Sequence, residues 1–539
     1  MFFGSKSIVP SVLGHCLQVQ PLNLSRRLSI YSLVGLSLLY ASAYFLPLLM
    51  PIGAFFLPSY DYLGLVCWPS LIAVGVGVCV LQVVAAAVRR WIGPRVATVL
   101  AVAALCVFAL IALKGIADAA GYDWSDRIPH LGKLAPSYRT IKLIAAIVVF
   151  VLVWMARGSI PKMTRALASL GFAFLALAAV RLSILTHAPT VGDYGQGPVA
   201  AGSLAPLAPK LATADALPRR VVWVIFDETD FQRVFGVQRA PQLHLPNFER
   251  LASISLFAAR ANSPASATLF SLPALLTGTP LGGAGVRFDT YGRLTLQRTA
   301  GGWLPFDEAT SIFGAVSAGG RGVSVLGFLH PYCKIFATQR CESVHWPRVG
   351  ALDDALLANI PDVLSNRLGH PNSWEAMTEH ILQVLPEYLV RDDALTFVHI
   401  DLPHPPSDYA DKALHLQPSS DPLVSYSHNL MLTDRVLGNI LSIMQEQSAR
   451  HELLLVVSSD HWLRNSWYRP NVPESSSPVP MMIWRVGDTK GTLLSEPLST
   501  IHTANMVLSF LKGEISTQAD IARWWSNKPV YPTFIGPGT

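Results

Sequence analysis

The segments VVWVIFDETD, residues 221–230, and LLLVVSSDHW, residues 453–462, decide the fold of this chain. Each begins as an apolar, largely β-branched run, which is typical of a strand buried on both faces. Each then ends abruptly in acidic, hydroxyl or imidazole side chains. Parallel strands bring their carboxyl ends to one edge of the sheet, where α/β folds bind ligands. The two segments therefore predict an α/β domain with a site at that edge.

The residues at the two strand ends are those that bind divalent metals. Asp227 and Glu228 close the first segment, and Asp460 and His461 close the second. We expect the four side chains to share one site although they are far apart in sequence. Carboxylates combined with an imidazole suit zinc, manganese or a similar cation. This pattern predicts a metalloenzyme.

The region from residue 219 to residue 539 alternates between strand and helix signals. Such alternation predicts a mostly parallel sheet with helices covering both faces. The strands are expected at 221–226, 322–328, 395–400, 453–459 and 480–485. Helices are expected at LPNFERLA, at SPASATLFSLPALLTG, and at 373–388, 424–447 and 499–512.

The first part of the chain has the composition of a membrane domain. The whole sequence is 51% hydrophobic and 14% charged, and the bias is concentrated before residue 187. Five apolar stretches approach or exceed the ~18–20 residues that cross a bilayer core. They predict a five-helix transmembrane domain over residues 1–186, with spans near 29–50, 63–88, 96–116, 140–157 and 166–186.

Basic residues indicate the orientation of these spans. Clusters of arginine and lysine fall on alternate loops, so the amino terminus is expected inside and everything after residue 186 outside. Residues 187–218 are rich in Ala, Pro and Gly, which predicts a linker before a catalytic domain at 219–539. Residues 1–218 hold 16 of the 41 Lys and Arg and 6 of the 35 Asp and Glu. The net positive charge thus belongs to the membrane half, and we predict no nucleic-acid partner.

Cysteine usage supports an outward-facing domain. Of the six cysteines, only Cys333 and Cys341 lie beyond residue 218. Two cysteines close in sequence predict one local disulfide and therefore an oxidising compartment. The alternative is a pair of buried free thiols.

The segment SPASATLFSLPALLTG predicts a helix amino terminus beside the site. Hydroxyl side chains at its start predict that one of them is an N-cap. A helix amino terminus attracts anions, and a hydroxyl next to a divalent cation becomes a nucleophile. The residues alone leave four candidates, which are Ser263, Ser266, Thr268 and Ser271.

These motifs together resemble a known superfamily. D-E at a strand end, PNxxRLA, a hydroxyl before SLPALLTG, HxxxPHxP and SDH occur in the order found in the alkaline phosphatase/sulfatase superfamily. Five spans, a linker and an outward domain further resemble its membrane-bound phosphoethanolamine transferases and lipoteichoic-acid synthases. The transferase pattern T-x-x-S-x-P matches Thr268, Ser271 and Pro273. The resemblance therefore implies that Thr268 is the nucleophile.

The resemblance also implies roles for the other motif residues. Glu228, Asp460, His461 and Thr268 itself would bind the metal, and Asp227 could bind it as well. His404 would bind phosphate or a further metal and is the candidate base. We assign substrate contacts to His399, Asp401 and Ser271.

Two departures from the related families limit the chemistry. Sulfatases need a Cys or Ser that is modified to formylglycine, and Thr268 cannot form that aldehyde. The related transferases have a histidine shortly before the proline that opens the last strand, whereas SSSPV precedes Pro480 here. We therefore expect one metal ion instead of two. The expected ion is zinc, with manganese as the alternative.

The resemblance implies a phosphotransferase of the bacterial inner membrane, with a periplasmic or extracellular catalytic domain. It would move a phospholipid head group, phosphoethanolamine or phosphoglycerol, through a phospho-threonine onto an envelope glycan or lipid. The partners would be a phospholipid donor, that acceptor and the bilayer. The alternatives are an outward-facing phosphodiesterase or phosphatase and a catalytically silent scaffold.

Overall fold

The computed structural model describes five stretches of the chain. It also describes a few residues between Tyr31 and Phe55, and Leu204. The stretches are 160–186, 217–344, 374–405, 409–469 and 474–536. Chain contacts divide the protein into two compact units. The first comprises Met1–Met50, Ser59–Thr186 and Val349–Ala351, and the second Pro51–Pro58, His187–Arg348 and Leu352–Thr539.

One described helix is long and apolar enough to cross a membrane. Helix α8 spans Ile160–Thr186 and contains the apolar segment Thr164–Leu185 of 22 residues. It covers the last of the five predicted spans and begins earlier than expected. The first predicted span is described only at a few residues between Tyr31 and Met50, and the second, third and fourth spans and most of the linker lie outside the described residues. The five-span topology therefore stays a prediction.

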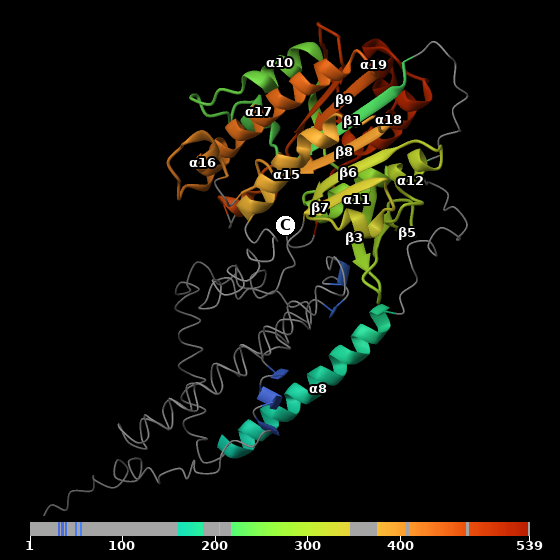
Figure 1. Ribbon diagram of the computed structural model, residues 1–539. Coiled ribbons are helices and arrows are strands. Elements are labelled where there is room, and N and C mark those ends of the chain that lie inside the picture. Colours follow the sequence, from blue (N-terminus) through green and yellow to red (C-terminus); the bar gives the residue numbers. More distant parts are fainter. Residues whose placement is uncertain are drawn as a thin grey trace, which may run out of the picture. The chain divides into compact units, whose positions relative to one another are not determined.

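The second unit is built on a nine-stranded sheet, which Figure 1 shows as a twisted layer of arrows. Strand β10 is antiparallel to both of its neighbours, and all other pairings in the sheet are parallel. The predicted mostly parallel sheet is thus confirmed. In spatial order the strands are β11 (Thr492–Leu494), β2 (Leu256–Asn262), β10 (Val479–Arg485), β9 (Glu452–Ser458), β1 (Arg219–Phe226), β8 (Leu395–Ile400), β6 (Val323–Phe328) and β7 (Arg340–Val344), with β12 (Leu498–Ser499) paired to β2.

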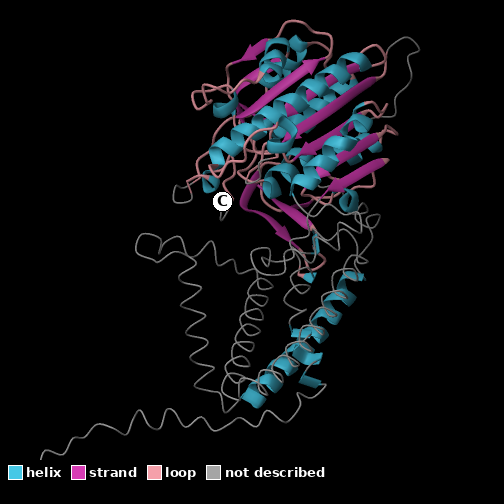
Figure 2. Cartoon of the chain, turned by 60° about the vertical axis from the view of Figure 1, so that its left-hand side comes forward, coloured by secondary structure: helices cyan, strands magenta, loops and turns pink. Residues whose placement is uncertain are grey.

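Helices cover both faces of this sheet, as predicted (Figures 1 and 2). Alternate residues of β1 point to opposite faces. Val222 and Val224 join one apolar core, and Val221 and Trp223 join the other. The first core contains α10 (Pro246–Ile254), α15 (Trp374–Leu389) and α17 (Pro422–Gln447); the second contains α11 (Thr268–Thr277), α12 (Ile312–Ser317), α18 (Thr503–Lys512) and α19 (Gln518–Ser526).

Several short elements were not predicted. A separate antiparallel sheet consists of β3 (Leu281–Phe288), β4 (Leu294–Arg298) and β5 (Trp303–Pro305). Short helices are α9 (Phe231–Val234), α13 (Tyr332–Ile335) and α16 (Ala410–Leu414), and 3₁₀ turns cover Asn465–Trp467 and Thr500–His502. The helix predicted at 499–512 begins only at Thr503, because this last 3₁₀ turn precedes it.

Candidate metal centre

The carboxyl ends of β1 and β9 meet, as the two opening segments predict. The strands are adjacent and parallel, with Ile225 opposite Ser458 in the register. Just beyond the strands, the backbone N–H of Glu228 donates to Asp460 Oδ1 at 3.1 Å. The two acidic loops are therefore hydrogen-bonded together at the edge of the sheet.

Helix α11 brings Thr268 to the same place. Thr268 Oγ1 lies 3.2 Å from His461 Nε2 and 3.4 Å from Asp227 Oδ1. The helix begins at Thr268 itself, and its N-cap is Ala267, which has no side-chain capping bond. The prediction of a hydroxyl N-cap was therefore wrong. Because Thr268 is already in the first turn, its hydroxyl faces the acidic loops instead of the helix backbone.

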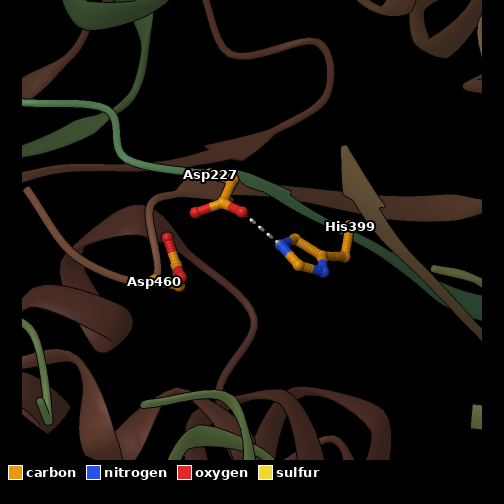
Figure 3. A group of neighbouring side chains, drawn as sticks. All are labelled: Asp227, His399 and Asp460. Atoms are coloured by element: carbon orange, nitrogen blue, oxygen red, sulfur yellow. Dashed lines mark ion pairs between the residues drawn. The ribbon is translucent and has the colours of Figure 1, made fainter. Parts of the chain in front are cut away.

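Three buried side chains form a group that fits a cation. Ligand atoms of Asp227, His399 and Asp460 lie within 4.8 Å of one another. Figure 3 shows these three side chains gathered together. His399 Nε2 is 3.7 Å from Asp227 Oδ2. Asp227 Oδ2, Asp460 Oδ2 and His399 Nε2 are buried and have no hydrogen-bond partner among the described residues. Buried polar atoms are seldom left unpaired, so this group suits a bound metal ion.

The electrostatics of the group support the same conclusion. Burial and the facing carboxylates of Asp460 and Glu228 raise the pKa of Asp227 well above its ordinary value. Two buried carboxylates that face each other are costly to ionise together. A divalent ion held by Asp227 and Asp460 would neutralise both charges.

His461 extends the group toward the hydroxyl of Thr268. His461 Nε2 is 3.3 Å from Asp460 Oδ2 and 3.8 Å from Asp227 Oδ1. Ligand atoms that each lie ~2.1 Å from one tetrahedral ion are ~3.4 Å apart. The spacing among Thr268, His461, Asp460 and Asp227 is therefore that of a four-ligand site.

Glu228 is held in a strained position. Its φ is 59°, in the left-handed region that glutamate rarely adopts. The Tyr426 hydroxyl donates to the Glu228 carbonyl at 2.7 Å and accepts from the Asp230 N–H at 3.0 Å. Glu228 Oε1 accepts from Arg464 Nε and from Trp467 Nε1, while Oε2 has no partner among the described residues.

The predicted proline-rich loop after β8 also reaches this edge. His404 is buried, and its Nε2 lies 3.4 Å from Arg464 Nη2. Burial lowers the pKa of His404 to about 4 and outweighs the nearby charge of Glu228, so its imidazole is neutral at pH 7. Asp401 is also buried and accepts a hydrogen bond from Thr378 Oγ1.

Ser271 has a different surrounding from the other predicted substrate contacts. Its side chain is fully buried, and its hydroxyl donates to the Asp460 carbonyl. This bond fixes α11 against the loop that carries Asp460. Ser271 thus acts on the position of that loop.

His330 is a site residue that our sequence analysis missed. It follows β6, and its Nε2 lies 3.1 Å from the carbonyl of Thr268. Its ring also contacts Phe55, with centroids 5.8 Å apart. Phe55 is 3% exposed and belongs to the apolar core of the second unit. Lys334 Nζ donates to the carbonyl of Ala54, which fixes the same short segment.

The missed residues had a detectable signal. His330 lies two residues after the carboxyl end of β6, where the strand-end rule applied to β1 and β9 predicts ligands. Arg464 and Trp467 lie shortly after the SDH motif, within the same loop. Tyr426 lies inside the long helix α17 and has no such signal.

The predicted disulfide is present. Cys333 and Cys341 are bridged, with their Cα atoms 5.4 Å apart. The bridge connects α13 to β7, at the end of the sheet that carries His330.

The chain is similar to several proteins of known structure. No curated protein matches the chain. Similar solved structures include a protein of glycosaminoglycan metabolism from Bacteroides thetaiotaomicron, with 18% identity, a TM-score of 0.38, and coverage of 55% of this chain and 73% of that chain. The phosphonate monoester hydrolase of Agrobacterium radiobacter has 14% identity, a TM-score of 0.35, and coverage of 54% and 73%.

A third similar structure is the soluble domain of lipooligosaccharide phosphoethanolamine transferase A from Neisseria meningitidis. It has 14% identity and a TM-score of 0.35, and the match covers 56% of this chain and 90% of that chain. These values are too low to transfer an activity to the present chain.

The match to a family model is more specific. Residues 323–513 match the model described as Sulfatase. The matched segment contains His399, His404, Asp460 and His461 but not Thr268. Residues 323–513, which lie within the α/β domain, are thus similar to the Sulfatase family.

Proposed function

We propose that the protein is a metal-dependent membrane phosphotransferase. It would take a phosphoethanolamine or phosphoglycerol head group from a phospholipid and pass it, through a phospho-threonine, to an envelope glycan or lipid. The observation that carries this proposal is the position of the Thr268 hydroxyl, 3.2 Å from His461 Nε2 and 3.4 Å from Asp227 Oδ1. A hydroxyl that lies among metal ligands is positioned to act as a nucleophile once a metal ion activates it.

The ligands proposed for the cation are the carboxylates of Asp227 and Asp460 and the imidazole of His461, with Glu228 Oε2 and His399 Nε2 as further donors. A bound zinc or manganese ion would lower the pKa of the neighbouring hydroxyl and neutralise charge on a phosphoryl oxygen. The donor set of carboxylates and imidazoles suits zinc, with manganese as the alternative.

In the first step, Thr268 Oγ forms a bond to phosphorus, and the bond from phosphorus to the diacylglycerol oxygen breaks. The hydroxyl proton passes to Asp227 Oδ1, and the departing oxygen takes a proton from water. The amino terminus of α11 faces the phosphoryl group, where its N–H groups favour an anion.

In the second step, the acceptor hydroxyl attacks phosphorus and the bond to Thr268 Oγ breaks. His404 is neutral at pH 7, so its imidazole can take the proton of the acceptor. Thr268 regains its proton from Asp227, and His404 releases the acceptor's proton to the hydroxide that the first step left in solution, so the site returns to its starting state.

A membrane location is part of the proposal. Segment Thr164–Leu185 is long and apolar enough to span a bilayer, and the Cys333–Cys341 bridge is typical of oxidising compartments. We propose a multi-pass protein of the bacterial inner membrane with its amino terminus in the cytoplasm and its catalytic domain outside. A lipid donor would then reach the domain at the membrane surface.

Mass spectrometry tests the proposed intermediate. The full-length protein is purified in detergent, loaded with zinc and mixed with vesicles of phosphatidylethanolamine or phosphatidylglycerol. We expect an added head-group mass on the peptide that contains Thr268, and the identity of that mass names the transferred group. The matched control is Thr268→Ala, which must show no adduct. An unmodified Thr268 with both lipids, in zinc-loaded and folded protein, refutes the transferase.

Hydrolysis is the second candidate, because the Sulfatase match fits ester cleavage as well as transfer. Water would then replace the acceptor in the second step. Release of free phosphoester, without label on any added glycan or lipid, selects this alternative.

A further inference from the structure

Arg464 is a cation built into the metal centre. Its Nε donates to Glu228 Oε1, and its Nη2 lies 3.4 Å from His404 Nε2. Its guanidinium lies over the Trp467 ring, 5.2 Å from the centroid. The Arg464 side chain is 22% exposed, whereas Glu228 is fully buried. The guanidinium therefore lies at the boundary between the buried carboxylates and the open side of the site.

The geometry leaves both partners with capacity for a ligand. Arg464 has five N–H donors in a fixed fork, and its Nη1 has no hydrogen-bond partner among the described residues. Glu228 uses only Oε1 for Arg464 and Trp467, and its Oε2 is buried without a hydrogen-bond partner among the described residues. Glu228 can thus bridge the cation and the guanidinium through its two oxygens.

We propose that Arg464 binds a non-bridging oxygen of the substrate phosphoryl group beside the single metal ion. The inference rests on the proposed function and names a further substrate-binding residue for it. Trp467 and Glu228 orient the guanidinium. The positive charge of Arg464 takes the place of a second metal ion. A planar guanidinium suits a tetrahedral oxyanion because two parallel N–H bonds can form.

The same arrangement defines the class of substrate. Asp227, Glu228 and Asp460 carry three negative charges when ionised, and one divalent ion with Arg464 carries three positive charges. The centre is then neutral before substrate binds. A phosphodiester adds one negative charge, whereas a phosphomonoester adds nearly two above its second pKa of about 6. Like charges in a buried site repel strongly, so the centre favours a monoanionic ester such as a lipid phosphodiester.

Kinetics with two model esters test this inference. Zinc-loaded full-length protein is assayed at pH 8 with bis(p-nitrophenyl) phosphate and with p-nitrophenyl phosphate. We expect a higher kcat/KM for the diester. In Arg464→Gln, kcat/KM for the diester is expected to fall about 100- to 1,000-fold, the usual effect of removing one donor to a developing oxyanion. Arg464→Lys, which keeps the charge but loses the fork, is expected to lie between the two.

A binding measurement separates substrate contact from a structural role. Titration calorimetry measures the affinity of inorganic phosphate for zinc-loaded and zinc-free protein, and elemental analysis measures the bound zinc. Arg464→Gln is expected to weaken phosphate binding at least tenfold in the zinc-loaded protein with its zinc content unchanged. The matched control is Arg485→Gln, which removes a surface pair with Asp488 and must change neither quantity.

Two results overturn the inference. One is unchanged phosphate affinity in folded, zinc-loaded Arg464→Gln, and the other is a preference of the native protein for the monoester at pH 8. Failure of the proposed transferase function would give a different result from either of these. A native protein that transfers no lipid head group but still loses phosphate affinity in Arg464→Gln refutes only the transferase.

Discussion

The hydroxyl of Tyr426 offers a direct test of how the strained Glu228 is held. Tyr426→Phe removes a donor to the Glu228 carbonyl and an acceptor for the Asp230 N–H. Tyr426 is 1% exposed, so water does not replace these bonds. A buried group left unpaired costs about 1–3 kcal/mol. With two such groups, we expect a loss of about 2–6 kcal/mol in the free energy of unfolding.

The strain at Glu228 adds a second expected effect. Left-handed backbone at a residue with a Cβ costs about 1–2 kcal/mol, which the Tyr426 bonds offset. Without them Glu228 relaxes, and its carboxylate moves from Arg464 and from the cation site. We therefore expect zinc affinity to fall about 10- to 100-fold, as for other residues that orient metal ligands.

Thermal unfolding of full-length protein in detergent measures the first effect, and competition with a zinc chelator measures the second. About 2 °C per kcal/mol is usual for larger domains, so Tm is expected to fall by about 4–12 °C. Tyr388→Phe is the matched control, because its hydroxyl contacts Glu342 at 3.4 Å, away from the Glu228 loop. Should Tyr426→Phe match this control in both Tm and zinc affinity, the bridging role is refuted.

Three further predictions follow from the site and the disulfide. Thr268→Ala is expected to abolish head-group transfer yet keep bound zinc, whereas Thr268→Ser keeps measurable transfer; parallel activity and elemental assays decide this. Burial lowers the pKa of His399 and His404 from 6.5 to about 4. The unfolded chain then binds protons first, so in the metal-free protein these two histidines are expected to contribute their full share of stability above pH 6.5 and to lose it as pH falls toward 4. A pH series of Tm values checks the sign, and rising Tm on acidification contradicts it. Reducing the Cys333–Cys341 bridge, which closes a short loop, is expected to cost about 2.5 kcal/mol, measured as a lower Tm with a reductant present.

The sheet and its principal helices were predictable because their patterns are local. The apolar runs at β1, β8 and β9 are bounded by polar residues, and their predicted ends agree with the structure within two residues. The meeting of Asp227 with Asp460 also followed from strand order, since adjacent parallel strands end together. Much of the candidate centre could thus be predicted from the residue types at strand ends.

Other features depend on contacts that no local pattern shows. The hydroxyl of Thr268 faces the acidic loops because α11 starts one residue after Ala267, a boundary that the sequence does not specify. The role of Tyr426 depends on the packing of α17 against the Glu228 loop. The grouping of His399 with Asp227 depends on a side-chain direction, and the sequence alone suggested only a substrate contact for it.

The burial of Phe55 has a practical consequence for anyone who expresses residues 219–539 alone. A cut within residues 187–218 removes the Phe55 ring. The site that this ring fills, beside His330 and Phe288, remains in the fragment. Emptying a site of that size costs about 3–5 kcal/mol. The truncated protein would therefore contain a cavity next to His330, the side chain that contacts the Thr268 carbonyl. We expect such a fragment to be less stable and less active than the intact protein. A synthetic peptide carrying residues 51–58 should restore part of the lost stability and activity.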